Sequence, residues 1–127
     1  MNTKAIILSA ILGISTPAII DMAIPSQAMA VQKFNYPNNT FSDKEWTVTL
    51  KFTNNSYQYY GKHIPKNTSI NLSGAVASGS HERQIYTWNN NGTKYQVVWK
   101  PNDPNYIRVQ VIDRGKIVLN RLLQAIP

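Results

Sequence analysis

The chain contains no cysteine, which excludes disulfide bonds and also lipid attachment at a lipoprotein cysteine. Only two histidines are present, His63 and His81, so a zinc site with three protein ligands would have to recruit a distant carboxylate. We therefore expect neither a metal site nor a cofactor. Acidic residues are scarce, with six Asp and Glu against thirteen Lys and Arg. The formal net charge of +7 favours anionic partners over cationic ones.

Long apolar runs are absent except near the N-terminus. There, Lys4 precedes an apolar stretch at residues 5–20, and an Ala-Met-Ala sequence follows at residues 28–30. A cationic start, a short hydrophobic segment and an A-x-A site are typical of a secretory signal peptide. An uncleaved membrane anchor is the alternative, but it needs about 20 consecutive apolar residues, and Pro17 interrupts this run. The pattern predicts that residues 1–30 are a cleaved signal peptide and that no transmembrane segment remains afterwards.

The remaining chain, residues 31–127, has the length of a single domain. Residues 31–44 are largely polar and have no clear period, which predicts an extended N-terminal arm. From Glu45 onward the pattern alternates, and Trp46, Val48, Leu50 and Phe52 fall on one face. This alternation predicts a strand with one buried side. We assign residues 45–127 to an antiparallel β domain.

Two turns set the expected register of the second half. Asn91-Gly92 is a strong signal for a two-residue hairpin, because both central residues of a type I′ turn need a positive φ. Asp113-Arg114-Gly115 fits a three-residue loop with glycine in the left-handed position. The first turn pairs Trp88 with Tyr95, Tyr86 with Val97 and Gln84 with Trp99, and the second pairs Val111 with Ile117 and Val109 with Leu119.

Counting the alternating segments gives about seven short strands, which predicts an all-β fold, either an antiparallel sandwich or a small barrel. Residues 61–67 and 75–80 are expected to be loops. Only the tail at 119–125 could become helical.

Five Asn-x-Ser/Thr sequences are candidate glycosylation acceptors in a eukaryote, but asparagine is also a standard turn residue, and we favour that interpretation.

Residues that could carry catalysis are few. The segment 78–82 holds serine, histidine and glutamate, but a catalytic triad is assembled from separated segments, and the chain has no G-x-S-x-G elbow. Asp43 and Glu45 would face the same side of a strand, yet a solvated position beside Lys44 explains them better than a glycosidase pair. We therefore expect a protein that is not an enzyme.

Basic side chains alternate along the polar side of the second half. Lys94 and Lys100 lie on that side of one expected strand, Arg108 lies on the neighbouring strand, and Tyr60 faces away from Tyr57 and Tyr59. Cations beside an aromatic ring can bind nucleic acid by charge and stacking, but an exported protein rarely meets it. The same chemistry suits an anionic polysaccharide or another envelope component. The alternative is that these side chains form an ordinary solvated sheet face that binds no ligand.

The sequence also resembles known proteins. Residues 57–123, above all RQIYTWNN at 83–90 and KYQVVWKPNDPNYIR at 94–108, resemble a small exported domain found among cyanobacterial proteins without an assigned function. The resemblance implies a bacterial, exported β domain and supplies no catalytic residue. It implies the periplasm, the extracellular medium or the thylakoid lumen as the compartment.

A second likeness concerns the loop ahead of Tyr86. Ser78-Gly79-Ser80 is similar to a segment of the periplasmic lysozyme inhibitors of the membrane-bound C-type class, which are small β-barrels that place a loop serine in the enzyme's cleft. That likeness implies a protein-binding module or hydrolase inhibitor, with Ser78, Ser80 and His81 as its contact residues. Because lysozymes are themselves basic, long-range repulsion from a +7 protein makes this the alternative to glycan binding.

Overall fold

The computed structural model describes residues 34–127. The expected signal peptide and its cleavage site lie outside the described residues. The described part of the chain forms nine strands and no helix, so it holds no helical segment that could cross a membrane. The strands are β2 (Asn39–Ser42), β3 (Trp46–Thr53), β4 (Ser56–His63), β5 (Thr68–Ser73), β6 (Val76–Gly79), β7 (Gln84–Asn90), β8 (Thr93–Trp99), β9 (Tyr106–Asp113) and β10 (Lys116–Ala125).

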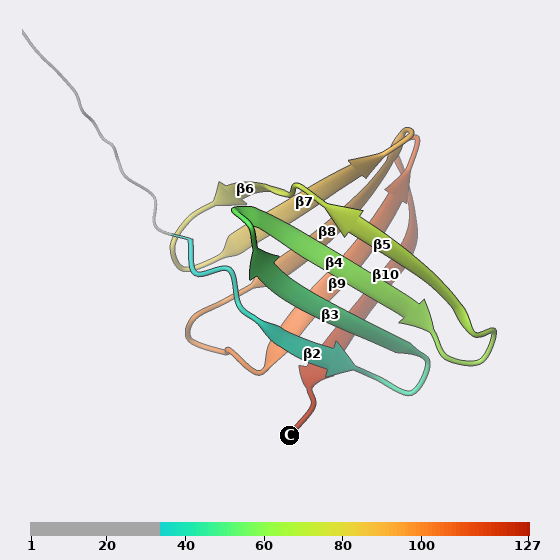
Figure 1. The fold of residues 1–127 in the computed structure, drawn as a ribbon, viewed down its shortest axis with the longest axis horizontal. Helices are drawn as coiled ribbons and strands as arrows, with labels where there is room; N and C mark the ends of the chain where they lie inside the picture. The colour runs from blue at the N-terminus through green and yellow to red at the C-terminus, as the bar shows by residue number, and fades with distance from the viewer. Residues whose placement is uncertain (1–33) are drawn as a thin grey trace, which may run out of the picture. The chain divides into compact units, whose positions relative to one another are not determined.

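All nine strands belong to one antiparallel sheet with the order β5-β4-β3-β2-β10-β9-β8-β7-β6. The sheet curls into a half-barrel, and Figure 1 shows β3, β4 and β5 crossing in front of β7 to β10. The seam between the two halves is the short pairing of β2 with β10. The all-β prediction is therefore confirmed, although the strand count is nine and not about seven.

The core lies between the two halves of the curled sheet. It is dominated by aromatic rings, and Tyr59 on β4 packs against Trp88 on β7 with ring centroids 5.2 Å apart. Aromatic pairs of this kind add to the stabilisation that comes from buried area. The buried apolar residues are Phe41, Val48, Leu50, Tyr57, Tyr59, Tyr86, Trp88, Val97, Trp99, Ile107, Val109 and Leu123.

The hairpin at Asn91-Gly92 has the predicted register. Both turn residues have a positive φ, at 51° and 87°, as a type I′ turn requires. Trp88 pairs with Tyr95, and the two further predicted pairs are also present. The turn chemistry alone was sufficient to fix this part of the sheet.

The predicted register of the second hairpin is wrong. Asp113 pairs with Lys116, so the loop has two residues, and Arg114 adopts a positive φ of 49° together with Gly115. The register then shifts between Ile117 and Leu119, and Leu119 lies opposite Val111. A bulge inserts one residue on one strand and so restores the alternation of faces. The bulge keeps Leu119 on the core side despite the shorter loop.

Four segments predicted as irregular or helical contain strand residues. The expected arm at 31–44 contains β2, the expected loop at 75–80 contains β6, and β4 continues through Gly61 to His63. The tail at 119–125 is the end of β10 and is not helical. In each case pairing with a neighbouring strand provides partners for the backbone N–H and C=O groups, which a short local pattern does not reveal.

The asparagine-rich turns follow the turn interpretation at three of the five Asn-x-Ser/Thr positions. Asn54, Asn67 and Asn91 have φ angles between 51° and 52°, in the left-handed region that asparagine tolerates better than most residues. Asn38 instead accepts a hydrogen bond from the Phe52 N–H at 2.6 Å. Four of these asparagines thus have a structural role.

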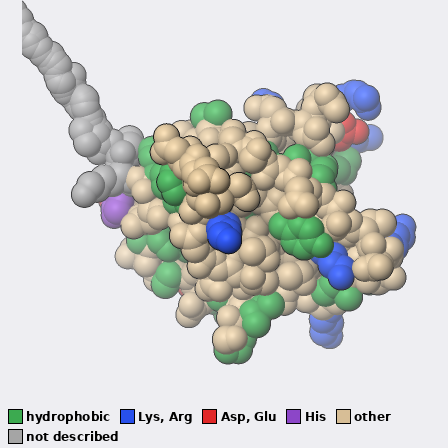
Figure 2. Space-filling view, in the orientation of Figure 1, with side chains coloured by type: hydrophobic (Ala, Val, Ile, Leu, Met, Phe, Trp, Pro, Cys, Tyr) green, Lys and Arg blue, Asp and Glu red, His purple; other side chains and the backbone are tan. Residues whose placement is uncertain are grey.

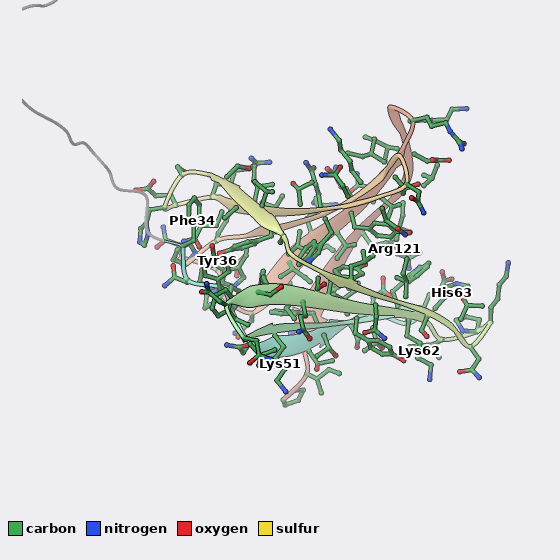
Figure 3. The ribbon with its side chains drawn as sticks, turned by 45° about the horizontal axis from the view of Figure 1, so that its top comes forward. Phe34, Tyr36, Lys51, Lys62, His63 and Arg121 are labelled. Carbon is green, nitrogen blue, oxygen red and sulfur yellow. The ribbon has the colours of Figure 1, made fainter. Side chains whose placement is uncertain are left out.

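The N-terminal segment closes one end of the half-barrel. Gln84 is fully buried, and its side-chain amide donates to Asn35 Oδ1 at 2.7 Å while its Oε1 accepts from the Asn35 N–H at 2.9 Å. The Tyr86 hydroxyl donates to the same Oε1 and accepts from the Tyr36 N–H. The Tyr36 ring packs on Tyr57 with centroids 5.2 Å apart. Figure 3 shows Phe34 and Tyr36 at this end and His63 at the other.

Candidate functional site

The three cations chosen from the sequence lie on one outer surface. Lys94 is on β8, Lys100 directly follows β8, and Arg108 is on β9, where it pairs with Val98. All three side chains are exposed. Their neighbours in sequence, Tyr95 among them, face the interior, as the alternation along a strand requires.

Two of these cations line a common groove of about 230 Å³. Lys100 and Arg108 lie in its wall together with Arg83, which the sequence analysis did not select. Arg108 Nη1 donates to Asn120 Oδ1 on β10 at 2.9 Å, which restrains one side of its guanidinium. We call this feature the outer groove. The remaining lining residues are Val98, Asp103, Tyr106, Ile107, Gln110 and Leu122.

Lys94 and Tyr60 lie outside the outer groove. Lys94 is separated from Val98 by four positions along β8, or roughly 13 Å at the rise of an extended strand. Tyr60 is on β4, which four strands separate from β8 in the sheet order. Because the sheet curls, the outer side of β4 and the outer side of β8 belong to different halves. The structure therefore brings together Lys100 and Arg108 but does not bring Tyr60 to them.

The alternative binding loop is a tight turn between β6 and β7. Ser78 lies on β6, while Ser80 exchanges backbone hydrogen bonds with Arg83 at 3.1 and 3.3 Å. The His81 carbonyl accepts from the Gln84 side chain at 2.8 Å. All three predicted residues of this loop are exposed. Because the turn positions Arg83, the predicted loop and the outer groove adjoin.

Basic side chains are dispersed over the surface. Figure 2 shows Lys and Arg side chains at several separate places on one face and very little acidic surface there. Asp43 and Glu45, which we expected to be solvated beside Lys44, both bind Arg121, at 2.9 and 3.0 Å; the Glu45 side chain is still half exposed, whereas that of Asp43 is largely covered. In residues 34–127 no three His, Cys, Asp or Glu side chains lie close enough to hold a metal ion.

A second concavity, which the sequence analysis missed, lies on the inner side of the sheet. It has a volume of about 290 Å³ and is open to solvent on one side. Its walls come from β3, β4 and β5 on one half and from β8, β9 and β10 on the other, and we call it the inner pocket. Mainly apolar and aromatic residues line it, including Trp46, Tyr59, Ile70, Tyr95, Val111 and Leu119.

Gly61 shapes the wall of the inner pocket. A Cβ at this position would lie 2.7 Å from Tyr59 Cε1 and 3.0 Å from the Tyr59 hydroxyl oxygen, so any larger residue would force the Tyr59 ring to move. Burial raises the pKa of the Tyr59 hydroxyl above its ordinary value of 10.0, and the neighbouring Tyr95 acts in the same direction. The alternation Tyr57-Tyr59-Gly61-His63 was the signal in the sequence that could have placed Gly61 on this inner face.

Comparisons of the chain with models of known protein families, with curated proteins and with solved structures find no match. The candidate sites therefore rest on their own chemistry. The outer groove offers cations beside apolar surface and one tyrosine ring. The inner pocket offers aromatic walls and hydroxyl groups.

Proposed function

We propose that this protein is an exported, non-enzymatic binding domain whose outer groove holds an anionic glycan of the cell envelope. The observation that supports the proposal is the convergence of Arg83, Lys100 and Arg108 on one groove. They come from three different parts of the chain, and the groove contains a single carboxylate, that of Asp103.

The groove suits a sugar that carries an acidic group. Arginine guanidinium groups bind carboxylates and sulfates through paired hydrogen bonds, and Lys100 adds a mobile point charge. Tyr106, Val98 and Leu122 provide apolar surface on which a sugar ring can lie. Exposed ion pairs contribute little individually and are screened by salt, so binding would require several repeated contacts along a polymer.

Retention on immobilised alginate, a polymer of uronic acids, tests this proposal. We expect the wild-type protein to be retained at low ionic strength and released as salt increases. The triple variant Arg83→Gln, Lys100→Gln, Arg108→Gln should elute much earlier while its thermal midpoint stays unchanged, since all three side chains are exposed. Lys94→Gln should have a smaller effect because Lys94 lies outside the groove.

A matched control separates a site from general charge. Lys51, Lys62 and Lys66 belong to the β3–β5 half of the sheet, away from the groove. Changing these three to glutamine removes the same net charge. Equal losses of retention in the two triple variants would contradict a groove-centred site, as would failure of the wild-type protein to bind. Either outcome would favour the alternative, a protein partner that contacts the turn carrying Ser78, Ser80 and His81.

A further inference from the structure

The inner pocket contains a buried hydroxyl group with no partner in the described chain. Tyr59 is only 2 % exposed, and within residues 34–127 its hydroxyl has no hydrogen-bond partner. The other buried tyrosines differ, since the Tyr57 hydroxyl donates to the Pro37 carbonyl and the Tyr86 hydroxyl to Gln84. Buried polar groups in proteins are nearly always paired. Tyr59 and Gly61 both line the pocket, and the Tyr59 hydroxyl oxygen lies beside Gly61, so this hydroxyl is available to a molecule in the pocket.

The groups around this hydroxyl define the kind of molecule that fits. The Tyr59 and Tyr95 rings lie with centroids 5.8 Å apart, and Trp46 at the pocket wall packs on His63 at 4.4 Å. Aromatic walls favour a flat apolar ligand that stacks against them. Within the described residues, neither the Trp46 indole N–H nor the Tyr95 hydroxyl has a hydrogen-bond partner. The pocket thus combines apolar walls with a few side chains that carry polar groups, as small-molecule sites do.

The volume of the pocket limits the size of the ligand. A cavity of about 150 Å³ accommodates benzene, and this pocket has about 290 Å³. Two fused aromatic rings, or one ring with a short substituent, would fill it. The ordinary pKa of a tyrosine hydroxyl, 10.0, already keeps Tyr59 protonated near neutral pH, and burial raises this pKa further, so the hydroxyl can donate a hydrogen bond.

We propose that the inner pocket binds a small, uncharged, flat aromatic molecule with one acceptor atom, to which the Tyr59 hydroxyl donates a hydrogen bond. The site lies between the halves of the sheet and shares no lining residue with the outer groove. Binding here is therefore independent of glycan binding, and either proposal can fail without the other.

Two probes of almost identical shape test this assignment. Quinoline has a ring nitrogen that accepts a hydrogen bond, whereas naphthalene has none. We expect saturable binding of both to the folded protein at neutral pH, followed by the fluorescence of the tryptophans and by calorimetry. Tyr59→Phe should weaken quinoline binding about threefold to tenfold, the effect of one hydrogen bond, and leave naphthalene binding unchanged.

A second pair of variants locates the site. Leu119 on β10 lines the inner pocket, whereas Ile117 on the same strand is 57 % exposed and lines neither the inner pocket nor the outer groove. Leu119→Trp should fill the pocket and abolish binding of both probes, while Ile117→Trp should leave it intact. The proposal is overturned if neither probe saturates the wild-type protein, if Tyr59→Phe binds both probes as the wild type does, or if a folded Leu119→Trp protein still binds them.

Discussion

Arg121 on β10 reaches Asp43 in the turn between β2 and β3, and its Nε donates to Asp43 Oδ2 at 2.9 Å. The same guanidinium donates to Glu45 Oε1 at 3.0 Å. This contact crosses the seam where β2 and β10 share only two paired positions. A small ionic cluster thus supports the part of the sheet with the least backbone pairing.

Acid should weaken this seam. Burial acts to raise the pKa of Asp43, but hydrogen bonds from the N–H groups of Glu45 and Trp46 and the charge of Arg121 outweigh it, so the pKa lies below the ordinary 3.8. A lowered pKa adds stability that is fully present above pH 3.8 and is lost as the pH falls through the folded-state value. We expect Asp43→Asn to lower the thermal midpoint at neutral pH, with the difference from wild type shrinking toward about pH 2. A constant difference across this range would contradict the role of the charge.

Replacing Trp99 tests which face of β8 is buried in the core. It is 8 % exposed, and its indole N–H donates to the Pro104 carbonyl at 3.1 Å. Trp99→Ala should destabilise the fold by about 3 to 5 kcal/mol, as large core truncations do. Lys100→Ala, on the opposite side of the chain, should change stability by less than about 0.5 kcal/mol. Urea melts of both variants measure this, and equal small effects would show that the face assignment is wrong.

Replacing Gln84 tests whether its hydrogen bonds hold the segment that contains Asn35 and Tyr36. Gln84→Leu leaves the Asn35 N–H without its partner and removes the acceptor of the Tyr86 hydroxyl, which should cost about 1 to 3 kcal/mol. Hydrogen exchange at the amides of Asn35 and Tyr36 should accelerate. Gln96→Leu is the control, because within residues 34–127 the Gln96 side chain bonds only Thr87, at 3.3 Å on the outer side of the sheet. Unaltered exchange in Gln84→Leu would mean that the ring contacts alone hold the segment.

Two glycines with the same backbone conformation should respond differently to alanine. Gly74 and Gly79 have φ angles of 81° and 84°. Alanine at either position has the strain of the left-handed region, about 1 to 2 kcal/mol. At Gly79 the added Cβ would also lie too close to the Arg83 carbonyl oxygen, whereas nothing lies within 4 Å at Gly74. Gly79→Ala should therefore be the less stable variant in a urea melt, and the reverse order would argue against the described turn geometry.

Export and removal of the signal peptide both remain predictions from the sequence. Signal peptidase should cleave before Val31, because small residues stand at the two recognised positions of residues 28–30. The described fold begins at Phe34 and would be left complete. Sequencing the N-terminus of the exported protein checks this, and a product that still begins at Met1 would contradict both cleavage and the expected compartment.

The sequence by itself determined those features that depend on neighbouring residues. Alternation placed Tyr57 and Tyr59 inside and Tyr60 outside, because successive side chains of a strand point to opposite faces. Asn91-Gly92 fixed a complete hairpin register, because few residues tolerate a positive φ. These rules act within a few residues and therefore operate before any tertiary contact is known.

Only the tertiary structure decided which distant segments meet. The sheet includes β2 and β6, and a bulge changes the pairing of Leu119. Arg83 lies in the same groove as Lys100 and Arg108. Tyr60 belongs to the other half of the sheet. The tertiary structure also formed the inner pocket, whose two walls come from opposite halves of the fold. The physical reason is that pairing between distant strands and the curl of a sheet arise from the burial of the whole chain, and the local pattern of residues does not encode them.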